Sequence, residues 1–120
     1  MTKIDVNQFM TEILGMWTET DLAARRAAIE SHFDEGVIFH DPDGEFVGHD
    51  GIEAFSDSLQ RRFPGARFKF ADAPQMLGNA IRGIWRFGPP DNPNAISGMD
   101  FAIWDGRRVT ALYAFVEKPQ

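Results

Sequence analysis

The sequence predicts an α+β fold, with three helices in its first half and an antiparallel sheet in its second half. Up to about residue 65, apolar residues recur every three or four positions, which is typical of helices with one buried face. After Gly65, short runs rich in Ile, Val, Trp and Phe are separated by turn-forming residues, which indicates strands. No internal repeat or linker divides the 120 residues, so we expect one domain, residues 1–120, with the helices on one face of the sheet.

Apolar spacing and capping residues predict the first two helices. The first helix is expected from residue 6 to about residue 17, with its apolar face formed by Val6, Phe9, Met10, Ile13, Leu14 and Trp17. The polar segment 18–21 can cap the second helix, whose apolar positions reach Phe33. Gly36 is a suitable stop for this helix.

Two short strands and a third helix are predicted next. The β-branched and aromatic run at 37–40 indicates a strand, which ends at the turn-forming segment 41–44, and a brief extended stretch follows at 45–47. Asp50 can cap the third helix, because Glu53 lies three residues further on. Pro64 and Gly65 are expected to end it.

The second half of the chain is predicted to form an antiparallel meander. Phe68 and Phe70 alternate with basic residues, and longer apolar runs lie at about 79–87, 96–104 and 108–116. The loop 88–94 contains three prolines and two asparagines, and Asp105-Gly106 is a strong tight-turn signal between the last two runs.

Charge and composition exclude several classes of protein. A net charge of -6, with paired arginines scattered along the chain, argues against a nucleic-acid partner. No apolar run approaches the roughly 20 residues that a membrane span needs, so we expect no membrane partner. The chain has no cysteine and no secretory signal at its N-terminus, which makes the cytoplasm the expected location. The three histidines lack close metal-ligand spacing, so no metal is expected, and no phosphate-binding or dinucleotide motif indicates a cofactor.

Asp100 is the most informative single residue. It lies in the middle of a predicted strand, between large apolar neighbours, where a buried and unpaired carboxylate is costly. By strand alternation it shares a face with Gly98 and Ala102, whose small side chains leave room for a cavity. Asp100 therefore either lines a functional cavity, or forms a structural ion pair with Arg82 or Arg86, or faces outward.

Asp41 is the second candidate. It ends the first predicted strand, and the Asp41-Pro42 bond stiffens the backbone that carries it. An Asp-Pro pair also occurs in ordinary turns. If Asp41 and Asp100 share one cavity, two carboxyls in unlike environments can divide the roles of base and acid.

Several stretches carry a resemblance to a known family. These stretches are VIFHDPDGEFVGHDGIEAF, RFPGARFKF, AIRGIWRFGPP and GMDFAIWDGRRV, and the order of the predicted elements agrees with them over essentially the whole chain. The chain thus resembles the SnoaL-like branch of the nuclear transport factor two-like superfamily, which is related to ketosteroid isomerases and polyketide cyclases. The resemblance implies a cone-like curved, mostly antiparallel sheet with three N-terminal helices enclosing a pocket.

The resemblance also implies roles for the two aspartates. Asp41 matches the proton-shuttling base of ketosteroid isomerases, and Asp100 matches the residue that donates a hydrogen bond to the developing oxyanion. Ile13 stands near the position of the tyrosine that supplies the second donor in those enzymes, and the one tyrosine here is Tyr113, so steroid isomerisation is not implied. Arg82 lacks the nearby acid of limonene-epoxide-hydrolase-like members.

Two functional hypotheses follow. The first is a cofactor-independent isomerase or aldol-type cyclase that moves a proton on a hydrophobic carbonyl compound, with Asp41 as base and Asp100 as acid or oxyanion donor. The second is a small-molecule-binding or dimeric accessory domain without catalysis. Either would bind a small hydrophobic molecule, and aromatic residues expected to face inward are Trp17, Phe55, Trp85, Phe87, Tyr113 and Phe115.

A homodimer is expected as well. Dimers are frequent in the family that the chain resembles. In addition, the sheet face away from the helices would leave Ile84, Phe101 and Ile103 exposed in a monomer.

Overall fold

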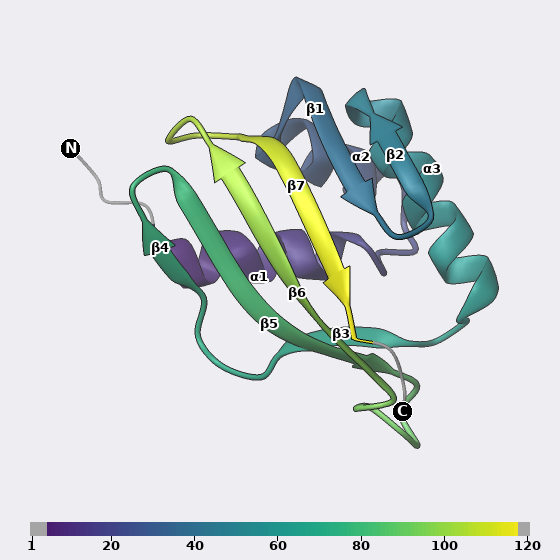
Figure 1. Ribbon diagram of the computed structural model, residues 1–120. Helices are drawn as coiled ribbons and strands as arrows, with labels where there is room; N and C mark the ends of the chain where they lie inside the picture. The colour runs from purple at the N-terminus through teal and green to yellow at the C-terminus, as the bar shows by residue number, and fades with distance from the viewer. Residues whose placement is uncertain (1–4, 118–120) are drawn as a thin grey trace.

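In the part of the chain that the structure describes, three helices and seven strands follow one another in the order that the sequence predicts, with one strand added (Figure 1). The computed structural model describes residues 5–117. In chain order the elements are α1 Val6–Met16, α2 Leu22–His32, β1 Phe33–Asp41, β2 Gly44–Val47, α3 Gly48–Arg62, β3 Arg67–Phe70, β4 Gln75–Leu77, β5 Ala80–Gly88, β6 Ile96–Trp104 and β7 Val109–Val116.

All seven strands belong to one sheet, whose order is β2-β1-β7-β6-β5-β3, with β4 paired to β5 beside this path. Each pairing is antiparallel except that of β1 with β7, which is parallel. The last strand therefore lies inside the sheet, between the first strand and the meander β5-β6-β7. This arrangement confirms the predicted α+β class and the mostly antiparallel, curved sheet.

The helices cover one face of the sheet, and Figure 1 shows α1 crossing behind the long strands while α3 lies beside β1 and β2. Asp5 caps α1 by accepting a hydrogen bond from Gln8 N, and Asp21 caps α2 in the same way through Ala23 N. The apolar stripe expected for α1 is buried at Phe9, Met10, Ile13 and Leu14. Burial of this stripe against the sheet holds α1 in place.

Charged side chains join α2 to its two neighbouring helices. Arg25 is 2% exposed and pairs with Asp57 of α3 at 2.6 Å. His32 Nε2 lies 2.7 Å from Glu12 Oε2 of α1, while its Nδ1 lies 2.8 Å from the carbonyl oxygen of Ala28. These contacts fix the helical layer that closes one side of the cavity described below.

Two helix boundaries and one additional strand differ from the sequence-based expectation. Gly36 does not stop α2, because Phe33 is already extended and begins β1. Asp50 does not cap α3: the capping position is Val47, which makes no side-chain cap hydrogen bond, and Asp50 lies in the first turn and pairs with Arg26 at 3.0 Å. β4 was not predicted, since its three residues are all exposed and carry no alternating pattern.

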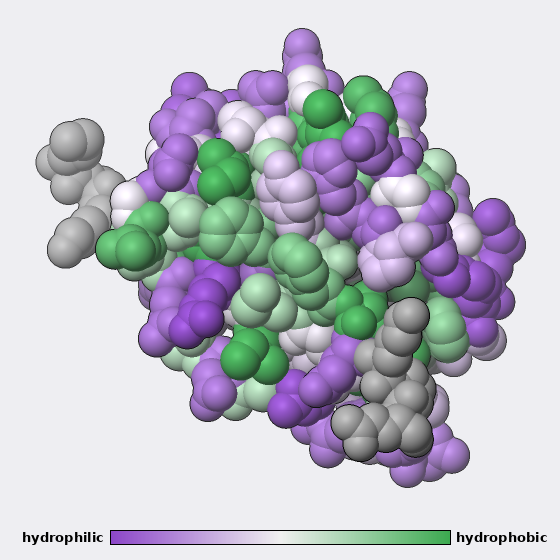
Figure 2. Space-filling model, in the orientation of Figure 1, coloured by the Kyte–Doolittle hydropathy of each residue, from purple (hydrophilic) through white to green (hydrophobic). Residues whose placement is uncertain are grey.

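The two faces of the sheet are both apolar, but only one is covered. Toward the helices point buried residues such as Val37, Phe39, Ile81, Ala102 and Leu112. Away from them, side chains of β5, β6 and β7 form a hydrophobic area in the centre of the face that Figure 2 shows. Within residues 5–117, no helix combines the length and apolarity needed to cross a membrane.

Candidate functional site

A cavity of about 230 Å³ lies between the covered face of the sheet, helix α3 and Trp17, the residue that caps the C-terminal end of α1. Its wall is mainly aromatic and aliphatic. The lining residues are Trp17, Phe39, Asp41, Pro42, Asp43, Phe55, Leu59, Arg62, Phe63, Phe68, Trp85, Phe87, Ile96, Asp100, Ala114 and Val116. This volume is slightly below the roughly 300 Å³ at which drug-sized sites begin, so any occupant is small.

Asp41 reaches the cavity from the end of β1. Because alternate residues of a strand point to one face, Asp41 shares the direction of buried Phe39. Its Oδ2 accepts a hydrogen bond from Asp43 N at 3.0 Å, which fixes the carboxyl against the turn that follows. Burial raises the pKa of the Asp41 carboxyl, while that hydrogen bond acts in the opposite direction.

Asp100 reaches the same cavity from the middle of β6. It is 4% exposed and lies between Gly83 of β5 and Ala114 of β7, its partners in the sheet. Its Oδ1 accepts a hydrogen bond from Trp85 Nε1 at 3.0 Å. Burial raises the pKa of Asp100 to about 7; the Trp85 hydrogen bond opposes this shift, and the charge of Asp41 adds to it.

The structure excludes an ion pair of Asp100 with either neighbouring arginine. Arg82 and Arg86 alternate with the inward-facing residues of β5, so they point to the opposite face of the sheet. Arg82 donates to Gln75 Oε1 at 2.7 and 2.9 Å, and Arg86 donates to the carbonyl oxygen of Trp85 at 3.2 Å. Asp100 is therefore a buried carboxyl without a cationic partner among the described residues.

A glycine explains why the surroundings of Asp100 are so apolar. The ring of Phe70 lies over Gly83, and a Cβ at position 83 would come within 2.5 Å of Phe70 Cε1. Since Gly83 is the cross-strand partner of Asp100, this ring covers the sheet directly beside the carboxyl. The absence of a side chain at position 83 thus allows an aromatic ring to exclude water from Asp100.

Four of the six predicted aromatic residues line the cavity. Trp17 packs on Phe39, with ring centroids 5.0 Å apart, and edge-on against Phe55 at 5.4 Å. Trp85 and Phe87 contribute the wall formed by β5. Among the residues that line this largely aromatic wall, the acidic groups are Asp41, Asp43 and Asp100.

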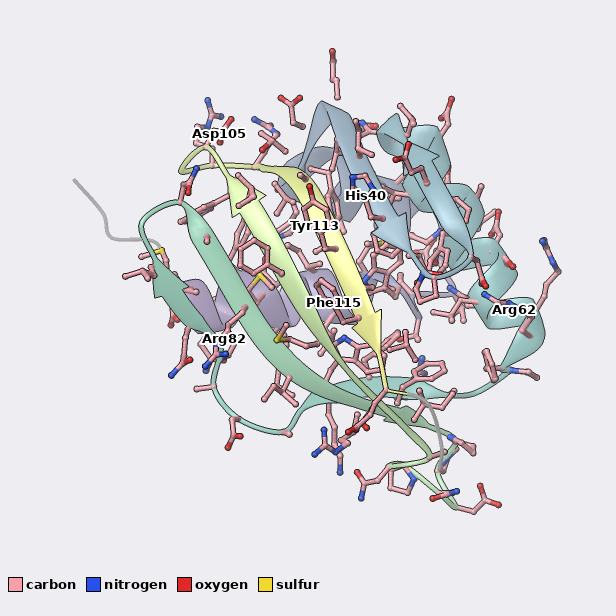
Figure 3. The ribbon with its side chains drawn as sticks, in the orientation of Figure 1. His40, Arg62, Arg82, Asp105, Tyr113 and Phe115 are labelled. Carbon is pink, nitrogen blue, oxygen red and sulfur yellow. The ribbon has the colours of Figure 1, made fainter. Side chains whose placement is uncertain are left out.

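Tyr113 and Phe115 were expected to face inward, and this expectation is wrong. Tyr113 stacks on the His40 ring, with centroids 4.5 Å apart, and Phe115 is 56% exposed; Figure 3 shows both on the open face of β7. The physical reason is the register of β7, which places Ala114 opposite Asp100 and therefore directs Tyr113 and Phe115 the other way.

Comparison with known families agrees with the fold. The SnoaL-like domain family matches residues 10–113. The chain belongs to the SnoaL-like family. No curated protein matches this sequence.

Solved structures similar to this SnoaL-like domain have the same fold. A candidate isomerase of the SnoaL-like family from Agrobacterium tumefaciens strain C58 is 28% identical, with a TM-score of 0.85 over 92% of this chain and 96% of that chain. A candidate polyketide cyclase from Acidithiobacillus ferrooxidans is 17% identical, with a TM-score of 0.73 over 98% of this chain and 92% of that chain. A protein with a ketosteroid isomerase-like fold from Catenulispora acidiphila, in complex with trimethylamine, is 14% identical, with a TM-score of 0.75 over 92% and 86%. At these low identities, the last two structures show only that their fold is shared with this chain.

Sequence reasoning missed the charged rim of the cavity in this SnoaL-like domain. Arg62 Nη1 donates to Asp43 Oδ2 at 3.3 Å, and its guanidinium lies 5.6 Å from the centroid of the Phe63 ring. Arg62 follows Phe55 and Leu59 at helical spacing, so it belongs to the α3 face that lines the cavity. That spacing could have identified it. Figure 3 shows Arg62 at the C-terminal end of α3.

The SnoaL-like domain offers no metal site within the part of the chain that the structure describes, since no three His, Cys, Asp or Glu side chains gather there. His32 binds Glu12 and the helix backbone. His40 lies 3.4 Å from Glu45 on the open face of the sheet, and His49 contacts the carbonyl oxygen of Phe33. The histidines therefore have separate structural surroundings.

Proposed function

We propose that this SnoaL-like domain binds a small hydrophobic carbonyl compound and moves a proton on it without a cofactor, as an isomerase or an aldol-type cyclase. Asp41 acts as the base, and Asp100 as the acid or oxyanion donor. The observation that carries the proposal is that two carboxyls in unlike surroundings, on different strands, border one apolar cavity. Two of the structures similar to this chain are named as a candidate isomerase and a candidate polyketide cyclase, which agrees with this class of reaction.

The environments of the two carboxyls suit different protonation states. Asp41 lies at the end of its strand beside the solvent-exposed turn 42–44. Burial raises the pKa of its carboxyl, but the hydrogen bond from Asp43 N and the charge of Arg62 favour the ionised form, which can accept a proton. Asp100 is buried among aromatic rings, and its pKa of about 7 keeps a large share of it protonated near neutral pH. One group can accept a proton while the other donates a hydrogen bond.

The proposed step conserves atoms and charge. The Asp41 carboxylate takes a proton from the carbon next to the carbonyl, and the electron pair of that C–H bond forms a C=C bond. The carbonyl π electrons move to oxygen, which the acidic proton of Asp100 stabilises. In a β,γ-unsaturated carbonyl compound the enolate is extended by the C=C bond, and return of the proton from Asp41 to the γ carbon re-forms the carbonyl and gives isomerisation. In a dicarbonyl compound, attack of the enolate carbon on the second carbonyl forms the ring C–C bond, and the new alkoxide takes the proton from Asp41, which gives cyclisation.

Exchange of hydrogen for deuterium tests this proposal without knowledge of the natural substrate. Small cyclic and aryl ketones are first screened for a rise in melting temperature, which reports binding to the native state. Each hit is then incubated in D₂O and followed by proton NMR. We expect wild-type protein to speed loss of the signal next to the carbonyl, and Asp41→Asn to abolish that acceleration. Asp34→Asn is the matched control: Asp34 lies in the same strand and also accepts a hydrogen bond from the backbone N–H two residues on, but it does not line the cavity, so the acceleration should remain.

The alternative is binding without catalysis. One observation favours it: among the described residues that line the cavity, none carries a hydroxyl group that could serve as a second oxyanion donor. Tyr113 cannot take this role from the opposite face of β7. Ketones that raise the melting temperature but exchange at the same rate with wild type and Asp41→Asn would establish this alternative and reject the catalytic proposal.

We further propose that the chain forms a homodimer through the open face of the sheet. Ile84 is 39% exposed and Phe115 is 56% exposed, while Met99, Phe101 and Ile103 on the same face are half-buried. Such a contiguous apolar area is unfavourable in water and is typical of interaction surfaces. Since the chain has no cysteine that needs oxidation, we propose a cytoplasmic location for this dimer.

Sedimentation velocity tests the dimer. We expect wild-type protein to sediment as a dimer at micromolar concentration, and the double variant Ile84→Lys/Phe115→Lys to sediment as a folded monomer because two buried charges oppose association. Leu22→Lys, at a 63% exposed position of α2 on the helical side, is the control that should remain dimeric. A monomeric wild type would reject the proposal.

A further inference from the structure

Trp85 holds the one hydrogen bond that the structure gives to the Asp100 side chain. The indole is 5% exposed, and its Nε1 donates to Asp100 Oδ1 at 3.0 Å. Trp85 is not opposite Asp100 in the sheet, because its cross-strand partner is Gly98. The ring must therefore extend diagonally over β6, from position 98 to position 100, to reach the carboxyl.

Gly98 makes this path possible. A Cβ at position 98 would lie 2.5 Å from Trp85 Cζ2, 2.7 Å from Trp85 Cη2 and 2.5 Å from the carbonyl oxygen of Phe115. Real Cβ atoms do not approach other atoms so closely, so any side chain here would displace the indole or the backbone. Phe68 packs edge-on against the indole, with ring centroids 5.1 Å apart, and restrains it from another side.

The kind of donor matters for the chemistry of Asp100. An arginine or lysine at this place would form an ion pair and keep the carboxyl ionised. The indole N–H carries no net charge and cannot accept a proton, so it supplies a hydrogen bond while leaving the carboxyl able to be an acid near neutral pH. The charged groups that face the same cavity from other elements are Asp41, Asp43 and Arg62, and Arg62 is engaged with Asp43.

A hydrogen bond to one carboxyl oxygen also decides where the acidic proton resides. In a neutral carboxyl group one oxygen is protonated and the other is the better acceptor. Because the indole N–H points at Oδ1, that oxygen has to act as the acceptor, and the proton is directed to Oδ2. Rotation of the carboxyl would break the Trp85 hydrogen bond.

We propose that Trp85 is a positioning residue for Asp100: through its indole N–H and the space left by Gly98, it fixes the carboxyl so that Oδ2 carries the proton offered to a ligand. The catalytic value of this positioning rests on the proposed proton-transfer function. The hydrogen bond between Trp85 and Asp100, however, is present without substrate, so it can be tested in the ligand-free protein.

NMR of the ligand-free protein tests the inference. The side-chain carboxyl carbon of Asp100 is followed from pH 5 to pH 9 in wild type and in Trp85→Phe, which keeps an aromatic ring but lacks the N–H. We expect the Asp100 midpoint to rise by about 0.5 to 1 pH unit in the variant, since a donor that favours the ionised form is lost. Trp104→Phe is the control, because Trp104 is also buried and lies on the same face of β6 as Asp100. This variant should leave the Asp100 midpoint unchanged.

A second measurement avoids any change to Trp85. The chain has three tryptophans, so the indole N–H signals that disappear in Trp17→Phe and in Trp104→Phe identify that of Trp85 by elimination. We expect this signal to follow the Asp100 midpoint with pH and to lose that dependence in Asp100→Asn. Gly98→Ala should weaken the same dependence by moving the indole.

Two outcomes would overturn the inference: an unchanged Asp100 midpoint in Trp85→Phe, or an indole signal in wild type that does not respond to Asp100. If Trp85→Phe fails to fold, the indole signal decides alone. A lack of deuterium exchange with every ketone would reject the proposed catalysis and leave these shifts in place, so the two failures are distinguishable.

Discussion

Replacing Asp100 with Asn should stabilise the protein at neutral pH, which is unusual for a buried polar residue. Asn resembles the protonated carboxyl in shape, and its side-chain oxygen can still accept the hydrogen bond from Trp85 Nε1. Unlike Asp, it cannot be forced to ionise inside an apolar wall. The expected gain comes from removing that cost.

The size of the effect follows from the pKa. Burial raises the pKa of Asp100 from 3.8 to about 7 in the folded protein. At about 1.36 kcal/mol per pH unit, this difference corresponds to about 4 kcal/mol as an order-of-magnitude upper value. Because the folded pKa lies above the unfolded one, wild-type stability is unaffected below about pH 4, and it falls as pH rises toward 7.

Urea unfolding at pH 4.5 and pH 7.5, followed by tryptophan fluorescence, measures this difference. We expect the free energy of unfolding of Asp100→Asn, relative to wild type, to increase by about 3 kcal/mol between the two pH values. Asp105→Asn is the matched control, since the backbone N–H groups of Arg108 and Arg107 lower the pKa of that exposed carboxyl. Its stability relative to wild type should change in the opposite direction with pH.

A large loss would refute the reasoning. If Asp100 had a cationic partner in solution, Asp100→Asn would leave that cation buried and unpaired, and stability at pH 7.5 would fall by about 3 to 5 kcal/mol. If the difference in free energy of unfolding between Asp100→Asn and wild type did not depend on pH, the pKa of Asp100 would not differ between the folded and unfolded protein, which would also refute the reasoning.

Three further predictions concern the cavity. Asp41→Asn should lower the pKa of Asp100, because the charge of Asp41 raises it; an unchanged NMR titration would show that the two carboxyls do not interact. Ala114→Leu, at the position opposite Asp100, should fill the cavity and weaken binding of the ketone hits by roughly tenfold or more in calorimetry, whereas Ala111→Leu on the open face of the same strand should bind them normally. Chelators, nicotinamide and flavin should leave ligand binding and melting temperature unchanged, and one metal atom per chain in elemental analysis would contradict this.

The two aspartates could be predicted from the sequence because each interrupts a pattern. Asp100 is a carboxyl inside an apolar strand, and Asp41 follows a β-branched run and precedes proline. A residue that conflicts with its local pattern draws attention without any knowledge of the fold. The meeting of these residues at one cavity depends on pairings between distant strands, which a local pattern does not reveal.

The inward face of β7 could not be predicted for a related reason. Residues 111–116 are apolar or aromatic at every position, because β7 is central in a sheet whose open face is also apolar. The alternation of apolar and polar residues then does not indicate which side chains face inward, and large aromatic residues are wrongly preferred to small ones as inward-facing residues. The cavity needs small side chains there, and Ala114 supplies one opposite Asp100.

The place of β7 in the sheet affects how the protein can be made. It is the last strand in the chain, yet it lies between β1, which carries Asp41, and β6, which carries Asp100. During synthesis at about 5 to 20 residues per second, the ribosome must release β7 before these two strands can be joined. Until then the apolar faces of β1 and β6 have no partner strand between them. We therefore expect nascent chains that end before residue 109 to depend on chaperones and to aggregate when those are depleted, since no shorter piece can close the wall that holds both carboxyls.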